Sequence, residues 1–179
     1  TKSGALMQIG CLIVPWDEKT MTVVQGKQPA GMKIKIDFPV SADATISEWV
    51  NKNQRELVDR CLALSSDSYP VKRNKLIDFF KKAKETYGGD IIPAGWCLGA
   101  DMAYLFHVLG EECEIVHYAG IDLKGMVIPM FKQVDPGDDE VRKLLGVAEN
   151  EDEHDALADA EYQMKLLLAA FKRINGDKS

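Results

Sequence analysis

The chain has 179 residues, of which 46% are hydrophobic, and a formal net charge of −6 at pH 7. This size and composition predict one soluble globular domain that spans residues 1–179. No apolar run approaches the ~20 residues of a membrane span and no signal peptide is visible, so we expect no membrane partner. The negative charge argues against binding of nucleic acid by bulk charge alone.

Two apolar segments and one alternating segment open the chain. Residues 5–14 form a nearly continuous apolar run, which is typical of a central strand buried on both faces. Residues 21–24 predict a second strand. Residues 32–38 alternate strictly between apolar and polar side chains, which indicates a half-buried strand near an edge. We expect these three strands to form a β-meander.

Helical patterns follow. Capping residues and periodicity predict short helices at 41–50 and 53–64 and a longer helix at 71–87, closed by Gly88-Gly89. The longer helix carries a basic cluster: Lys72, Arg73, Lys75, Lys81, Lys82 and Lys84. Such a cluster is usually a solvated helix face, and it becomes a phosphate-binding track only where it borders a binding site.

The last half of the chain alternates between strands and helices. A strand at 90–96 precedes a helix at about 101–109, and a second strand at 114–118 precedes a helix capped by Asp122. A short helix at 140–145 and a final helix from Asp155 to about Ile174 complete the chain. On the final helix we expect one apolar face: Leu157, Met164, Leu168 and Phe171. The whole pattern predicts an α/β fold with a mixed sheet flanked by helices.

The four cysteines are Cys11, Cys61, Cys97 and Cys113, and none of them forms a Cys-x-x-Cys pair. This distribution predicts reduced, mostly buried thiols and a cytoplasmic protein. A zinc site formed by Cys97, Cys113 and His117 is an alternative, but its spacing matches no common zinc motif. We expect His117, like His107, to be a packed structural residue.

The start of the final helix contains His154 and Asp159. Residues five apart lie ~140° apart around a helix axis, so the two meet only if His154 lies on the preceding loop. That geometry suits a hydrolase in which the aspartate holds a metal and the histidine takes a proton from water. In the alternative interpretation Asp155 is a helix N-cap and His154 is a solvated loop residue.

Asp101 follows the turn after the 90–96 strand. Carboxylates at the carboxyl ends of strands face the crevice in which α/β proteins usually bind ligands. The alternative is that Asp101 only caps the next helix.

Together these segments resemble the DEDDh 3′–5′ exonucleases, an RNase H-like group that includes the polymerase proofreading subunit and RNase T. The strand-turn-Gly99-x-Asp101 segment and the terminal His-x-x-x-x-Asp-Ala helix are similar to its second and third motifs. Residues 1–10 (TKSGALMQIG) and 45–49 (TISEW) are most similar to the phage-type branch, and the resemblance covers nearly the whole chain.

The resemblance implies an RNase H-like fold and two Mg²⁺ or Mn²⁺ ions that flank the scissile phosphate. Asp101 and Asp159 then supply two of four metal-binding carboxylates, and His154 is the general base. The substrate is single-stranded DNA or RNA, and Trp49 is the best candidate to stack on an unpaired base. Trp96 and Tyr104 are weaker candidates because core packing explains them equally well.

The first motif of the family, Asp-x-Glu on the first strand, has no counterpart in residues 1–179. The resemblance places this motif a few residues before Thr1, so we expect it upstream. We also expect residues 1–179 to lack the first strand of the domain. The 179 residues alone should then bind metal weakly and cleave nucleic acid negligibly. Two alternatives remain: a catalytically degenerate nucleic-acid-binding module on the same fold, and an unrelated α/β domain in which these residues are only caps.

Overall fold

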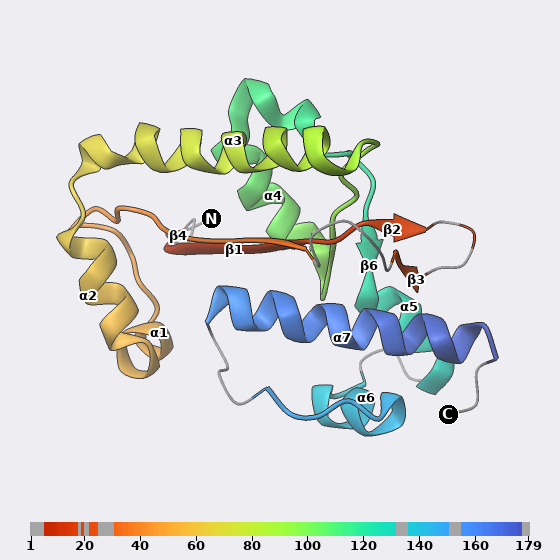
Figure 1. Cartoon of the computed structure of the whole chain (residues 1–179). Coiled ribbons are helices and arrows are strands. Elements are labelled where there is room, and N and C mark those ends of the chain that lie inside the picture. Colours follow the sequence, from red (N-terminus) through yellow and green to blue (C-terminus); the bar gives the residue numbers. More distant parts are fainter. Residues whose placement is uncertain are drawn as a thin grey trace.

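An antiparallel pair of strands lies at the centre of this computed structural model, which describes residues 6–17, 19, 22–24, 31–131, 136–150 and 155–176 (Figure 1). Strand β1 (Gln8–Ile13) pairs with β4 (Met32–Asp37). The alternation predicted for β4 is confirmed, because Ile34 and Ile36 are buried while Lys33 and Lys35 are exposed. The two faces of this pair therefore meet different surroundings.

The predicted β-meander is wrong for the described residues, which form three separate two-stranded sheets. Besides β1–β4, β2 (Trp16–Asp17) pairs with β3 (Thr22–Val23), and β5 (Ala94–Gly95) runs parallel to β6 (Ile121–Asp122). Pro15 lies two residues after the end of β1 and has no N–H to donate, so the first ladder does not continue into β2.

Strand β1 also differs from the expected central strand. All six of its residues are half-buried, and β4 is its one ladder partner among the described residues. The continuous apolar sequence of β1 thus corresponds to partial burial on both faces and not to complete burial.

Helices make up most of the rest of the fold. Their bounds are α1 (Glu48–Asn53), α2 (Arg55–Ala63), α3 (Tyr69–Tyr87), α4 (Leu98–Leu109), α5 (Leu123–Phe131), α6 (Asp138–Leu145) and α7 (Ala156–Ile174), with 3₁₀ turns η1 (Ser66–Ser68) and η2 (Gly110–Ile115). In Figure 1, α3 crosses one face of β1–β4, and α7 crosses the other with α6 beyond it. The described residues are thus mixed α/β.

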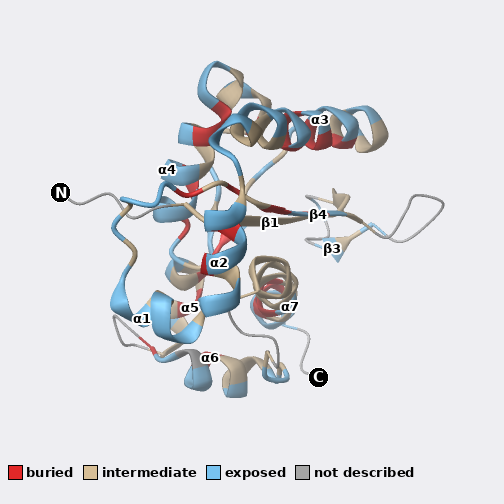
Figure 2. Ribbon diagram, turned by 90° about the vertical axis from the view of Figure 1, so that its left-hand side faces the viewer, coloured by how far each residue is buried: buried red, intermediate tan, exposed pale blue. Residues whose placement is uncertain are grey.

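Two apolar clusters correspond to these layers. One joins β4 to α3 and the end of α4 and contains Ile34, Ile36, Phe38, Leu76, Phe80 and Leu109. The other joins α5, α6 and α7 and contains Leu123, Val127, Val141, Leu167 and Ala170. Figure 2 shows the buried residues of α3 on the side of the helix that faces the strands.

The position of α7, with β1 on one side and α5 and α6 on the other, explains why the prediction of its apolar face is wrong. Of the apolar face expected there, only Phe171 is buried, while Leu166, Leu167 and Ala170 are buried in place of the others.

Three predicted elements differ in position. The strand expected at 114–118 is wrong, because η2 (Gly110–Ile115) covers its first two residues and residues 116–118 form no strand. The first predicted helix begins only at Glu48, because the Ser47 hydroxyl accepts a hydrogen bond from the Val50 N–H and fixes the N-cap there. Helix α4 begins at Leu98, three residues before the expected start.

The start of α7 lies directly against β1. A Cβ atom at Gly10 would lie 2.2 Å from the carbonyl carbon and oxygen of Ala156, so only glycine permits this approach. Gln8 accepts a hydrogen bond from the Ala156 N–H at 2.9 Å, and Lys35 pairs with Asp155 at 2.5 Å. The first strand pair therefore fixes where the last helix begins.

Within the described ranges, no helix combines the length and the apolar character that a membrane crossing requires.

Candidate active site

A tight turn leads from β5 into α4 and determines where Asp101 lies. Gly95 ends β5, and Cys97 is the N-cap of α4 in a left-handed conformation (φ 53°, ψ 46°) that non-glycine residues adopt rarely. Because α4 begins at Leu98, Asp101 is its fourth residue. The interpretation of Asp101 as the N-cap is therefore wrong.

The Asp101 carboxylate packs against the backbone of β5. Its Oδ2 lies 3.4 Å from the position that a Cβ atom at Gly95 would occupy. Desolvation at this position raises the pKa of Asp101 above its ordinary value. Burial raises the pKa of the neighbouring Cys11 thiol to about 12, and the negative charge of Asp101 adds to the effect. Asp101 as a whole is nevertheless exposed, so its carboxylate is only partly desolvated.

Gln163 of α7 reaches the same point from the opposite side. Its Oε1 lies 3.2 Å from that Cβ position at Gly95 and accepts a hydrogen bond from the Trp96 N–H at 3.0 Å. The absence of a side chain at Gly95 lets the Asp101 carboxylate and the Gln163 amide approach one backbone position. Sequence reasoning missed Gln163; its signal is the four-residue spacing from Asp159.

Asp159 lies in the first turn of α7. Residues four apart share a helix side, so Asp159 lies on the same side as Gln163, one turn closer to the start of the helix. Its Oδ1 accepts a hydrogen bond from the Asn150 amide at 2.8 Å. Asn150 was also missed, because it precedes the helix and no motif marks it. The structure thus brings Gln163, not Asp159 itself, to the backbone position that Asp101 approaches; the convergence of Asp101 and Asp159 stays a prediction.

Asp155 is the N-cap of α7, as its alternative interpretation proposed. Its carboxylate accepts hydrogen bonds from the N–H groups of Leu157 and Ala158 at 3.1 and 3.2 Å. The hydrogen bond from Lys35, together with these helix contacts, holds the pKa of Asp155 below its usual range. His154 lies outside the described residues, so its role as general base stays a prediction.

The other predicted aromatic and histidine residues lie on helices or turns. The Trp49 side chain on α1 is 52% exposed, as a stacking residue would require. His107 is exposed on α4, so its predicted packing is wrong. His117 lies after η2, outside any strand, and its Nδ1 contacts the backbone of Ala119.

Carboxylate and amide oxygens are the donors gathered near Gly95. Mg²⁺ binds through one or two carboxylates with several waters, so Asp101 and Asp159 fit one hydrated ion by chemistry. Within the part of the chain that the structure describes, no group of three His, Cys, Asp or Glu residues is arranged to hold a metal. The zinc alternative of Cys97, Cys113 and His117 is among the arrangements that this excludes.

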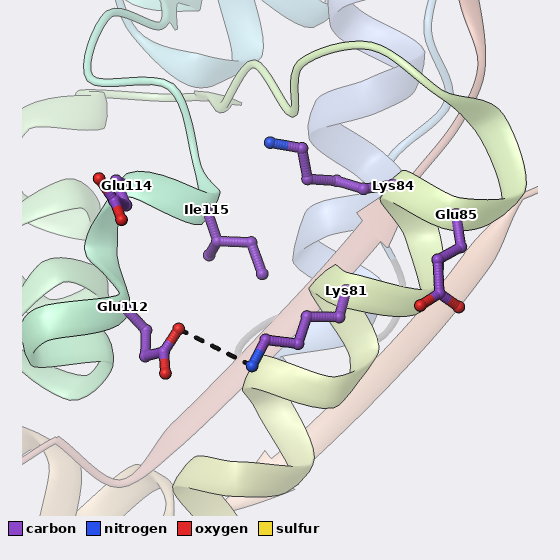
Figure 3. Close-up of a pocket in the computed structure, with 6 residues that line it drawn as sticks. All are labelled: Lys81, Lys84, Glu85, Glu112, Glu114 and Ile115. Atoms are coloured by element: carbon purple, nitrogen blue, oxygen red, sulfur yellow. Dashed lines mark ion pairs between the residues drawn. The ribbon is translucent and has the colours of Figure 1, made fainter.

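A shallow depression of about 470 Å³ lies elsewhere, between the end of α3 and η2 (Figure 3). Its lining residues carry both charges: Lys81, Lys84, Glu85, Glu112, Glu114 and Ile115. Lys81 pairs with Glu112 at 3.8 Å. The basic stretch of α3 therefore borders a hollow in which glutamates outnumber lysines, which does not favour a phosphate track.

Comparison of the chain with known protein families and with curated proteins finds no match.

Proposed function

We propose that the protein is a metal-dependent 3′–5′ exonuclease that removes nucleotides from the 3′ end of single-stranded DNA or RNA. One observation carries the proposal: Asp101 of α4 and Gln163 of α7 approach the same backbone position at Gly95. Asp159 precedes Gln163 by one turn on the same side of α7. These are the segments that resemble the second and third DEDDh motifs. Both segments contact Gly95, which has no side chain, although they are far apart in the sequence.

The division of roles follows from the donors present. Asp101 and Asp159 are the residues that hold Mg²⁺ or Mn²⁺, and Asn150 orients the Asp159 carboxylate. When bound, a pair of such ions supplies activation of water and stabilisation of the leaving 3′ oxygen. A two-ion centre needs two further carboxylates, which Asp101 and Asp159 do not supply. His154 takes a proton from the attacking water.

The direct test is degradation of single strands by the full-length gene product. Labelled DNA and RNA strands with a free 3′-hydroxyl should be shortened to mononucleotides with Mg²⁺ or Mn²⁺ and remain intact in EDTA. A blocked 3′ end should prevent the reaction, and blunt duplex should be degraded more slowly. Cleavage that ignores the blocked 3′ end, or that proceeds in EDTA, would contradict the proposal.

Replacement of Trp49 with alanine tests the proposed contact with the substrate. The side chain is half exposed on a short helix, so its removal should leave the folded state intact. Stacking on a base contributes ~1–3 kcal/mol, so binding of single strands should weaken by about 5- to 150-fold. The rate at which bound substrate is cleaved should change much less. Tyr118→Ala, which removes a more exposed aromatic residue, is the matched control; equal loss in both variants would exclude a specific role for Trp49.

A binding module without catalysis is the second candidate. It is favoured by the lack, among the described residues, of a group of three potential metal ligands. The two candidates differ in one measurement: the module binds single strands with the same affinity in EDTA and in Mn²⁺ and releases no mononucleotide.

A further inference from the structure

The Gln163 side chain of α7 makes a hydrogen bond to the β5–α4 turn. The donor in this contact is the backbone N–H of Trp96, which cannot accept, so the Gln163 atom facing it must be the oxygen. The contact is 3.0 Å long and joins residues 67 positions apart in the sequence. It therefore ties the last helix to the segment that carries Asp101.

The tie passes beside Asp101, one of the two predicted metal ligands. Asp101 Oδ2 and Gln163 Oε1 lie 3.4 and 3.2 Å from the same Cβ position at Gly95. Asp159 lies one helical turn before Gln163 on the same side of α7. A shift of α7 along or away from β5 would change the distance between Asp101 and Asp159. Gln163 opposes that shift because its oxygen accepts a hydrogen bond from the Trp96 N–H.

We propose that Gln163 is a positioning residue, which sets the spacing of the Asp101 and Asp159 carboxylates by clamping α7 to the Trp96 N–H. This inference rests on the proposed function, because it assigns a purpose to that spacing. Residues that orient metal ligands from outside the first coordination sphere typically contribute 10- to 100-fold in metal affinity or activity. Gln163 acts in this way, through the helix and not by binding the ion.

The test compares substitutions that keep or remove the accepting oxygen in the full-length gene product. Gln163→Met preserves length and removes the acceptor, and Gln163→Glu retains an oxygen that accepts from the Trp96 N–H. Lys165→Met is the matched control, because Lys165 is exposed on the same helix. For each protein the measurements are Mn²⁺ affinity by titration of free Mn²⁺, kcat and KM on a single strand with a free 3′-hydroxyl, and Tm.

We expect Gln163→Met to weaken Mn²⁺ binding about 10- to 100-fold and to lower kcat without changing KM. Gln163→Glu should bind Mn²⁺ at least as tightly as the wild type, and Lys165→Met should match the wild type. Equal weakening in the Met and Glu variants would overturn the clamp, because retention of the oxygen would then have no effect. If Gln163→Met does not fold, Gln163→Asn, whose shorter side chain does not reach Trp96, replaces it and must show the same loss.

Asp101→Asn separates this inference from the proposed function. If Asp101→Asn loses Mn²⁺ binding while Gln163→Met retains it, the clamp is wrong and the exonuclease proposal stands. If Asp101→Asn binds Mn²⁺ as the wild type does, the metal ligands are wrong and the clamp falls with them.

Discussion

Replacement of Gly10 with alanine is expected to destabilise the folded protein by about 3 kcal/mol, at the upper end of the usual range for an overpacked contact. The new methyl group would lie 2.2 Å from the carbonyl of Ala156 and 2.4 Å from the Leu157 nitrogen. These are backbone atoms at the start of a helix, so they cannot rotate away as a side chain would. Relief requires α7 to move off β1.

Gly99→Ala is the matched control for this substitution. Gly99 lies in the first turn of α4, and a Cβ atom there meets nothing within 4 Å. Because glycine is a poor helix former, this variant should be more stable by up to about 1 kcal/mol. Denaturant unfolding of both variants measures the difference. A Gly10→Ala protein as stable as the wild type would show that α7 does not start against β1.

Replacement of Asp101 or Asp159 with asparagine should have the largest effect on activity. Each change removes one negative charge from the proposed ligands and preserves the size of the side chain. We expect Mn²⁺ affinity and kcat to fall by at least about 100-fold, beyond the range for residues that only support ligands. The measurements are Mn²⁺ titration and release of mononucleotides by the full-length gene product.

Asp78→Asn is the control for these two variants, because Asp78 is an exposed carboxylate on α3. It should bind Mn²⁺ and degrade single strands as the wild type does. Removal of the Asp101 charge also relieves its desolvation, so that variant should not lose stability. If both Asp101→Asn and Asp159→Asn keep full activity, these carboxylates do not bind the catalytic metal.

Local sequence signals predicted the helices well because their causes are local. Asp155 caps α7 with its own carboxylate, and the apolar and polar alternation in 32–38 reproduces the two faces of β4. The strand order was not predictable in the same way. Pairing of β1 with β4 depends on which edges remain open after Pro15 stops the first ladder, and no window of neighbouring residues contains that information.

In the candidate active site, too, local features were predictable from the sequence and contacts between distant segments were not. The sequence pointed to Asp101 and Asp159 through local motifs, and the structure places them in the first turns of α4 and α7; their role as metal ligands stays a prediction. It did not identify Gln163 or the role of Gly95, since their contact depends on the rotation of α7 about its axis and on its distance from β5. Those two quantities are set by packing of α7 between β1 and α6, which involves segments from both ends of the chain.

The contacts between Gln8 and Ala156 and between Lys35 and Asp155 span 148 and 120 residues. Loops of that length must close before these contacts stabilise anything, which slows folding relative to a bundle of neighbouring helices. During synthesis, β1 is made well before α7, the helix that covers one of its faces. That face of the apolar strand therefore stays exposed until residues 156–174 have been made, as a target for chaperones or for aggregation.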